Sequence, residues 1–205
     1  QRFLALIVLS FVFSHTQAQF YSSFVGENIL GLATVTDSPA VAQNVLRYSN
    51  WINTSVQFHY DVSSFAGFYS GIQNSNIGFI VKQNDVVFKA RTYSVGVPLA
   101  IKLGNMSKHF YMALGAQEDL FYNYKQKVIY NNNKTKSNEW FSNKTNLLNS
   151  SFFAKVQLPK KSFIRFRYYP KSFYCDNQNI GLPDGSFLRD FNTQLFYISI
   201  GTNNF

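Results

Sequence analysis

The chain has 205 residues, of which 14% are charged and 18% aromatic, and its formal net charge is +9. Because a water-soluble domain usually carries charges on about a quarter of its residues, this composition argues against an ordinary soluble surface. The single cysteine, Cys175, excludes an internal disulfide. The basic residues are dispersed and accompany no nucleic-acid motif, so we expect basic loops near phosphate groups or a surface polymer, and no nucleic-acid partner.

An apolar run from Phe3 to Phe13 follows Arg2 near the start of the chain. It is too short to span a bilayer as a helix, and Thr16-Gln17-Ala18 after it has small residues at the two positions that a signal peptidase reads. We therefore predict a signal peptide at 1–18 and one domain at 19–205, with a buried helix or a retained anchor as the alternative. No later stretch is apolar over about 18 residues, so any membrane insertion must use strands.

Alternation of apolar and polar residues with a period of two predicts eight strands in the mature chain. A long connection after the first strand includes a helix-like stretch at 41–46, and the Asn-, Lys-, Ser- and Thr-rich segment at 131–149 is predicted to be a loop. Turn residues separate the other strands. The strands are expected at 24–36, 51–61, 65–81, 91–103, 108–124, 150–158, 162–169 and 191–202.

The strands at 91–103 and 108–124 form the clearest hairpin, and each of them has two different faces. Large apolar residues such as Leu99 and Leu114 share one face, whereas Gly, Ala, Ser and Gln dominate the other, with an occasional Lys or Asp. A soluble sandwich would carry more charges on its polar face. Small polar residues on one face and large apolar residues on the other are typical of a barrel whose outer wall meets lipid.

The predicted connections alternate between short and long. Short turns are expected at 62–64, 104–107 and 159–161. Bacterial outer-membrane barrels have short periplasmic turns and longer external loops. We therefore predict an all-β fold, an eight-stranded antiparallel up-and-down transmembrane β-barrel, which reaches the cell outer membrane through the periplasm. The external segments would be 37–50, 82–85, 129–149 and 170–190.

Polar residues on the inner face predict what fills such a barrel. A lumen of eight strands is narrow enough for side chains to fill. Mixed Lys, Arg and Asp side chains indicate an internal polar network, because buried charges must be paired. The alternative is a narrow anion-preferring path lined by the Lys and Arg members of the network, which would make the protein a minor porin. The predicted network residues are His59, Lys102, Gln117, Asp119, Lys155, Arg165 and Arg167.

Catalytic and metal sites are not expected. A barrel that modified lipid A would need a nucleophile and a His base on its outer face, near the external leaflet. The mature chain has two His residues: His59 is predicted to face the lumen near a periplasmic end, and His109 lies beside a periplasmic turn. Two His, one Cys and scattered carboxylates show no metal-ligand spacing. We therefore predict no catalytic residue, no metal site and no cofactor.

Two further functions stay open at the level of sequence. A barrel can anchor external loops for adhesion or for docking on another outer-membrane protein, and 129–149 and 170–190 would then be the contact segments, because loops of this length are often functional. Outer-membrane lipid and lipopolysaccharide would be its membrane partners. A soluble lipocalin-like binding barrel, with its apolar faces turned inward around a ligand, is the alternative fold.

Two strands of the central hairpin carry a family resemblance. In the run Val97-Pro98-Leu99-Ala100-Ile101-Lys102, an apolar residue, Pro and Leu precede a Lys, and Gly115 lies in the strand that follows after a short turn. These stretches resemble the outer-membrane β-barrel proteins of the Bacteroidota, a porin-like family, and the resemblance is specific between about residues 65 and 124. It implies an outer-membrane barrel that the barrel assembly machinery inserts.

Two positions depart from the pattern of that family. The family usually carries a carboxylate two positions before the strand Pro, where this chain has Gly96, so the resemblance does not extend to a lumen ion pair there. Family chains also tend to end with aromatic residues at the last and third-last positions, which the assembly machinery is thought to read. This chain has Phe205 but Asn203, and Phe205 is out of phase with the apolar face of the last strand. A bulge or a loose tail would account for the phase.

Overall fold

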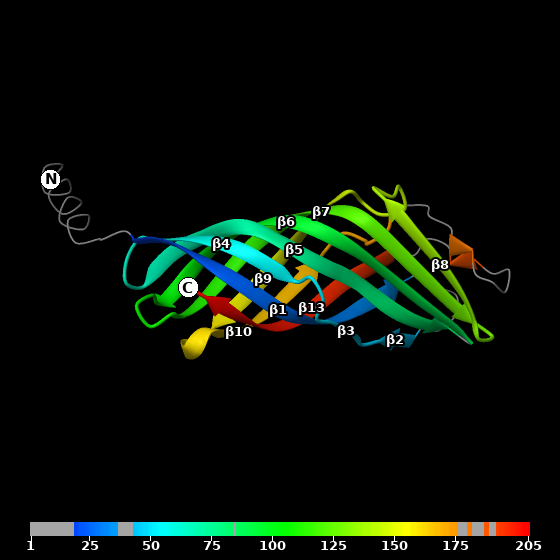
Figure 1. Ribbon diagram of the computed structural model, residues 1–205, viewed down its shortest axis with the longest axis horizontal. Helices are drawn as coiled ribbons and strands as arrows, with labels where there is room; N and C mark the ends of the chain where they lie inside the picture. Colours follow the sequence, from blue (N-terminus) through cyan, green and yellow to red (C-terminus); the bar gives the residue numbers. More distant parts are fainter. Residues whose placement is uncertain (1–18, 37–42, 84, 176–179, 182–186, 189–191) are drawn as a thin grey trace, which may run out of the picture.

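The protein is all-β over the residues that its computed structural model describes (Figure 1). Within them, one antiparallel sheet of eleven strands closes on itself, because β13 pairs with both β10 and β1, and the closed sheet forms a barrel. No helix in the described part of the chain is long and apolar enough to cross a membrane. The predicted signal peptide at 1–18 lies outside the described residues, which are 19–36, 43–83, 85–175, 180–181, 187–188 and 192–205.

Eight strands form the closed circuit, and each pairs with the circuit strand that follows it in the sequence. Each of the eight overlaps one of the predicted strands. Several strands are longer than predicted. The first begins at Gln19 rather than Phe24, because Phe20 and Ser22 continue its exposed face. The circuit consists of β1 (Gln19–Thr36), β4 (Thr54–Asp61), β5 (Ala66–Gln83), β6 (Val86–Asn105), β7 (Phe110–Tyr130), β9 (Leu148–Gln157), β10 (Ser162–Tyr169) and β13 (Asn192–Asn204).

Three short strands add to this circuit in the described ranges, so the predicted count of eight is too low for the sheet. β2 (Gln43–Val45) pairs with β5, which corrects the helix-like stretch expected at 41–46, and β3 (Arg47–Ser49) pairs with β1. β8 (Asn133–Trp140) pairs with β7, where a loop was expected at 131–149. β2 and β8 expose most of their side chains on both faces, so their sequences lack the apolar alternation by which strands are predicted.

The two ends of the barrel differ (Figure 1). The turns between β4 and β5, between β6 and β7, and between β9 and β10 lie at one end with the C-terminus, and the last of them is the 3-10 helix η1 (Pro159–Lys161). β2 and β8 lie at the opposite end, as does the small hairpin of β11 (Ile180–Gly181) and β12 (Phe187–Leu188). We call these the short-turn end and the long-loop end.

Side-chain polarity inverts along the central hairpin. Toward the short-turn end, β6 exposes apolar residues such as Leu99 and buries Lys102. Toward the long-loop end, the same strand directs Lys89 outward and buries Phe88. The strand therefore has an apolar exterior and a polar interior over one part of its length, and a basic exterior and an apolar interior over the other.

Stacked aromatic rings and a β-bulge mark the level of this inversion. The register between β6 and β7 shifts between Tyr93 and Ser94. On the outer face, the rings of Tyr93 and Tyr122 stack with their centroids 6.3 Å apart, and those of Tyr122 and Trp140 stack at 5.8 Å. We call Tyr93, Tyr122 and Trp140 the aromatic belt.

Candidate functional site

All seven predicted network residues lie inside the barrel, where each is at most 6% exposed. Six of them form hydrogen bonds in two groups, one in the middle of the lumen and one toward the short-turn end. The seventh, Lys155, is fully buried but makes no hydrogen bond within the described part of the chain. The two groups also include residues that the sequence pattern does not single out.

The central group is organised around Glu27 of β1, which was not predicted as a lumen residue. Gln73 Nε2 donates to one of its carboxylate oxygens at 2.5 Å, and Ser199 Oγ donates to the other at 2.8 Å. Arg165 forms an ion pair with Glu27 at 3.4 Å and donates to Gln73 Oε1 at 3.0 Å. The imperfect alternation of β1 hides the inward position of Glu27, although its parity with the buried Val25 indicates it.

Arg167 extends this group toward the long-loop end. Its Nη2 donates to Gln73 Oε1 at 3.0 Å and to Gln117 Oε1 at 2.9 Å. Gln117 Nε2 in turn donates to Asp119 at 2.8 Å, and Tyr169 Oη donates to the second carboxylate oxygen of Asp119, also at 2.8 Å. The side chains of β1, β5, β7 and β10 thus meet across the full width of the lumen.

Gly96 leaves the space that two of these side chains occupy. It pairs with Asp119 on the neighbouring strand, and a Cβ at residue 96 would lie 2.3 Å from atoms of both Asp119 and Gln117. A side chain at residue 96 would therefore displace them. The carboxylate that lies beside residue 96 in the lumen therefore comes from Asp119, across the β6–β7 ladder.

The other motif residues have structural positions. Val97 and Leu99 lie on the exposed face of β6, whereas Pro98 lies on the buried face. The carbonyl oxygen of Pro98 accepts a hydrogen bond from Ser70 Oγ of β5 at 2.8 Å. Gly115 faces the ring of Phe153, and a Cβ there would lie 2.6 Å from Phe153 Cζ. The motif residues therefore form part of the barrel wall and pack against side chains inside it.

The second group surrounds Lys102 at the short-turn end. Lys102 forms an ion pair with Asp61 and donates to Tyr21 Oη at 3.1 Å. Its Nζ also lies 3.3 Å from His59 Nδ1, while His59 Nε2 lies 2.8 Å from Ser23 Oγ. Asp61, Tyr21 and Ser23 were not predicted as site residues, because a sequence does not show which inward side chains meet across a lumen.

The geometry of the Ser23–His59 pair does not suit a nucleophile and its base. A neutral imidazole that accepts a hydrogen bond at Nδ1 carries its proton on Nε2, so His59 donates to Ser23 and cannot accept its proton. Both side chains are buried in the lumen. Over the described ranges, no cluster of three His, Cys, Asp or Glu side chains could hold a metal ion.

The C-terminal Phe205 turns toward the inside of the short-turn end. β13 pairs regularly with β1 up to Asn204, so neither a bulge nor a loose tail separates Phe205 from the strand. Asn203 is buried, and Phe205 has the same parity. The ring of Phe205 stacks on His109 at 3.9 Å between centroids and lies 5.8 Å from the ring of Tyr21. Phe205 is out of phase with the apolar outer face of β13 because its side chain points inward, where it covers the Lys102 group.

An aromatic cluster fills the long-loop end. Phe173 and Tyr174 follow β10, within the segment 170–190 that was expected to be an external loop, and are at most 1% exposed. The ring of Phe173 packs against Phe79 at 5.5 Å and against Phe121 at 5.8 Å, and Tyr174 Oη lies 3.0 Å from Tyr124 Oη. Apolar side chains inside this end of the barrel provide the surface on which these two aromatic residues pack, whereas Lys171 between them and β10 is exposed.

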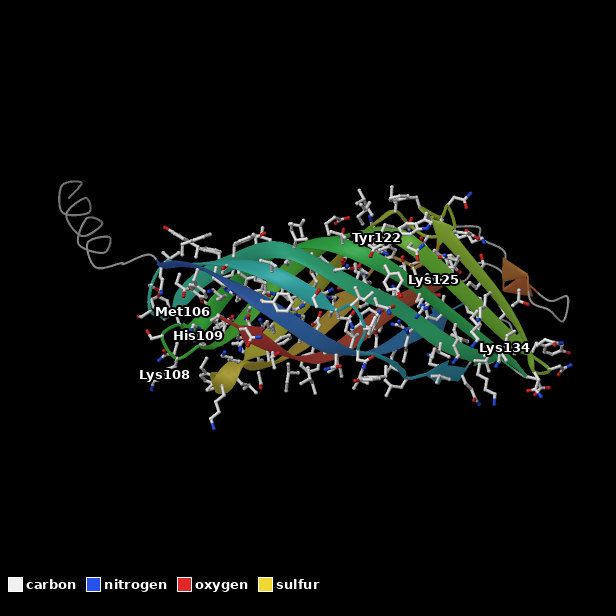
Figure 2. All side chains as sticks on the ribbon, in the orientation of Figure 1. Met106, Lys108, His109, Tyr122, Lys125 and Lys134 are labelled. Carbon is white, nitrogen blue, oxygen red and sulfur yellow. The ribbon has the colours of Figure 1, made fainter. Side chains whose placement is uncertain are left out.

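Basic side chains gather on the outer surface beyond the aromatic belt. Lys89, Lys127 and Lys136 lie directly opposite one another on β6, β7 and β8. In Figure 2, the labelled Tyr122, Lys125 and Lys134 follow one another toward the long-loop end. The sequence contains three separate basic pairs here, at 89/91, 125/127 and 134/136, and only the pairing of β6, β7 and β8 brings them together. We define the cationic ladder as Lys89, Arg91, Lys125, Lys127, Lys134 and Lys136.

The ladder residues nearest the short-turn end contact the aromatic belt. Lys125 Nζ lies 5.0 Å from the ring centroid of Tyr93, and the guanidinium carbon of Arg91 lies 5.8 Å from it. The carboxylate of Glu139 on β8 accepts hydrogen bonds from Lys144 and Ser142, which lie outside the ladder. These hydrogen bonds lower the pKa of Glu139 to about 2. Within the described residues, none of the six ladder cations forms an ion pair with Glu139 or another carboxylate.

No protein-family model and no curated protein matches this sequence. Among solved structures, the chain is similar to Ail, the attachment invasion locus protein of Yersinia pestis, at 11% identity and a TM-score of 0.35, covering 89% of this chain and 97% of Ail. Ail in complex with the heparin analogue sucrose octasulfate gives 12% identity, a TM-score of 0.33 and the same coverage. The outer membrane protein OprG of Pseudomonas aeruginosa gives 9% identity and a TM-score of 0.33, covering 92% of this chain and 97% of OprG. These similarities are too weak to assign a family.

Proposed function

We propose that this protein is an outer-membrane β-barrel that passes no solute, catalyses no reaction and presents a basic surface at the outer face of the membrane. The inversion of side-chain polarity at the aromatic belt carries the proposal. An apolar exterior around a polar interior suits hydrocarbon, whereas a basic exterior around an apolar interior suits water. A change from one to the other at stacked Tyr and Trp rings is what a membrane interface requires.

The exposed apolar surface also has the extent that a bilayer needs. On β6 it runs from Tyr93 to Leu103, and a transmembrane strand needs about 9–11 tilted residues. Leu99 in its middle is 66% exposed, and Ile72 on β5 is 59% exposed. Phe110 is exposed near the other edge. A soluble lipocalin-like barrel would turn such residues inward around a ligand, so the observed exposure opposes that alternative.

The proposal includes a topology and an export route. Eight strands would cross the membrane, with the short-turn end in the periplasm and the long-loop end outside the cell. Residues 1–18 would be removed as a signal peptide, and the barrel assembly machinery would insert the mature chain. The resemblance of residues 65–124 to the porin-like barrels of the Bacteroidota supports the same location.

Closure of the lumen is the first property to test. The Glu27 and Arg165 network lies across its middle, and aromatic side chains fill the long-loop end. Single-channel recordings in planar bilayers are expected to show no conductance steps above the baseline, and membrane fractionation is expected to recover the protein with outer membranes. Anion-selective steps would instead favour the path along the lumen cations, and recovery in the soluble fraction would contradict the membrane location.

The cationic ladder suggests the membrane partner. Lipopolysaccharide carries phosphate groups close to the interface, and the ladder begins at the aromatic belt. Lys and Arg side chains form strong charge-assisted contacts with phosphate. We therefore propose that the ladder binds lipopolysaccharide phosphates beside the barrel. Docking of another protein on the long-loop end is the second candidate, which the exposed Trp140 and Phe141 favour.

Neutralising the ladder is expected to release lipopolysaccharide. The variant with Lys89, Lys127 and Lys136 all changed to Gln should retain several-fold less lipopolysaccharide per barrel after purification in mild detergent, because the phosphates lose three adjacent cations. Quantitation of the co-purified phosphate checks this. The control changes Lys108, Lys160 and Lys161, exposed lysines at the short-turn end, to Gln and should retain wild-type amounts.

Equal losses in the two triple variants would contradict the ladder as the binding surface. A stoichiometric protein in the same purification would support the second candidate.

A further inference from the structure

The interior of the barrel holds more positive than negative charge. Among the described residues, five cationic side chains and three carboxylates are buried. A buried charge without a counter-charge is costly, so the excess requires compensation inside the barrel. The cations are Arg47, Lys102, Lys155, Arg165 and Arg167, and the carboxylates are Glu27, Asp61 and Asp119.

The least compensated of these cations is Lys155 on β9. Lys102 has Asp61 as its partner, and Arg165 has Glu27. Lys155 Nζ is fully buried and makes no hydrogen bond within the described part of the chain. Lys155 therefore adds to the lumen a positive charge that no ion pair balances among the described residues.

Lys155 also lies opposite a like charge. It pairs directly with Arg165 in the β9–β10 ladder, and like charges at directly opposed positions destabilise a sheet. Lys155 Nζ and the guanidinium carbon of Arg165 lie 4.4 Å and 5.2 Å from the same ring centroid, that of Phe163. An anion between the two cations would turn this repulsion into attraction.

Of the nine buried, unbonded side-chain polar atoms in the described residues, five can donate a hydrogen bond, and three are the amide oxygens of Gln57, Asn149 and Asn203. Arg165 Nε and Nη2 are buried and unbonded in the described structure, and so are the hydroxyl groups of Tyr69 and Tyr111. Lys155 Nζ lies 5.6 Å from the ring centroid of Tyr69. Because water needs acceptors as well as donors, a site lined mainly by ammonium, guanidinium and hydroxyl donors suits an anion better than water.

We propose that the barrel encloses a small inorganic anion of the halide class beside Lys155, held by Lys155 Nζ, Arg165 and the hydroxyl group of Tyr69. Phe205 covers the interior on the short-turn side, and the aromatic cluster of Phe173 covers it on the long-loop side. The anion would therefore be captured as the barrel closes and would add to stability without requiring a conducting path. This site does not depend on the membrane in which the barrel lies.

Refolding in different salts tests the site. The mature barrel is refolded into detergent micelles in sodium chloride, sodium bromide or sodium gluconate at equal ionic strength, and thermal unfolding is followed by electrophoretic mobility. The unfolding midpoint in chloride and bromide is expected to exceed that in gluconate, which is too large to enter, by about 4 °C or more. Crystals grown in bromide should show an anomalous peak within hydrogen-bond distance of Lys155 Nζ.

Variants separate this site from general salt effects. In Lys155→Met, the thermal unfolding midpoints in chloride, bromide and gluconate are expected to coincide, and the anomalous bromide peak is expected to vanish. Lys160→Met, on the exposed turn, should keep the wild-type differences between the three midpoints. Lys155→Gln replaces Lys155→Met if the methionine variant does not fold. Equal wild-type midpoints together with no bromide peak would overturn the proposal and assign the position to water.

Discussion

Replacement of Glu27 by leucine is expected to lower the free energy of unfolding by about 3–5 kcal/mol, because it leaves the buried Arg165 without its counter-charge. Gln73 and Ser199 would also lose the acceptor to which they donate. Glu27→Gln keeps one acceptor oxygen and is expected to cost less. Urea unfolding of the barrel in phospholipid vesicles, followed by tryptophan fluorescence, measures both changes.

Glu118 provides the matched control for this experiment. It is an exposed carboxylate on the outer face of β7, where it accepts a hydrogen bond from Ser150 at 2.5 Å. Glu118→Leu should leave the free energy of unfolding unchanged or raise it, because no buried cation depends on that carboxylate. If Glu27→Leu cost no more than Glu118→Leu, the central network would not stabilise the barrel.

Replacement of Leu99 by arginine is expected to destabilise the barrel in lipid by about 2–4 kcal/mol, since Leu99 lies midway along the exposed apolar part of β6, where a charge would enter hydrocarbon. The control is Val45→Arg. Val45 is an exposed residue of β2, beyond the aromatic belt, and arginine there is expected to lower the free energy of unfolding by less than about 1 kcal/mol. Unfolding in vesicles, together with the fraction of protein that inserts, measures both.

The same pair of variants separates the two barrel types that the sequence leaves open. In a soluble barrel, arginine at either exposed position would be nearly neutral, because surface substitutions away from special features change stability little. A soluble, folded Leu99→Arg protein with wild-type stability would therefore contradict the membrane-spanning wall.

Polar and apolar layers of side chains alternate along the barrel axis. The apolar cluster around Phe173 lies toward the long-loop end, the Glu27 network lies in the middle, and Phe205 covers the Lys102 group at the short-turn end. Each polar layer satisfies most of its hydrogen bonds within itself, as a buried network must. The cations that resemble a conducting path in the sequence are therefore mostly engaged with carboxylate or amide partners.

Strands with two chemically different faces were predictable from the sequence. Leu99, Leu114, Lys102 and Asp119 have the exposure that their alternation predicts, because the period of a strand assigns neighbouring residues to opposite faces. β2 and β8 were missed, because both of their faces are exposed and no alternation remains to be read. Segments of this kind are strands because their backbones pair with neighbouring strands, here β5 and β7.

By itself, the sequence determined which residues face inward along most of the wall, and hence that the interior would be polar and charged. Only the tertiary structure decided which inward side chains are in contact. It pairs Glu27 with Arg165, places Asp119 in the space beside Gly96, and leaves Lys155 Nζ without a hydrogen bond in the described residues. Register and closure of the sheet bring together residues more than a hundred positions apart, such as Glu27 and Arg165. Periodicity fixes the direction of a side chain, but contact depends on distance, which the sequence pattern of a single strand does not contain.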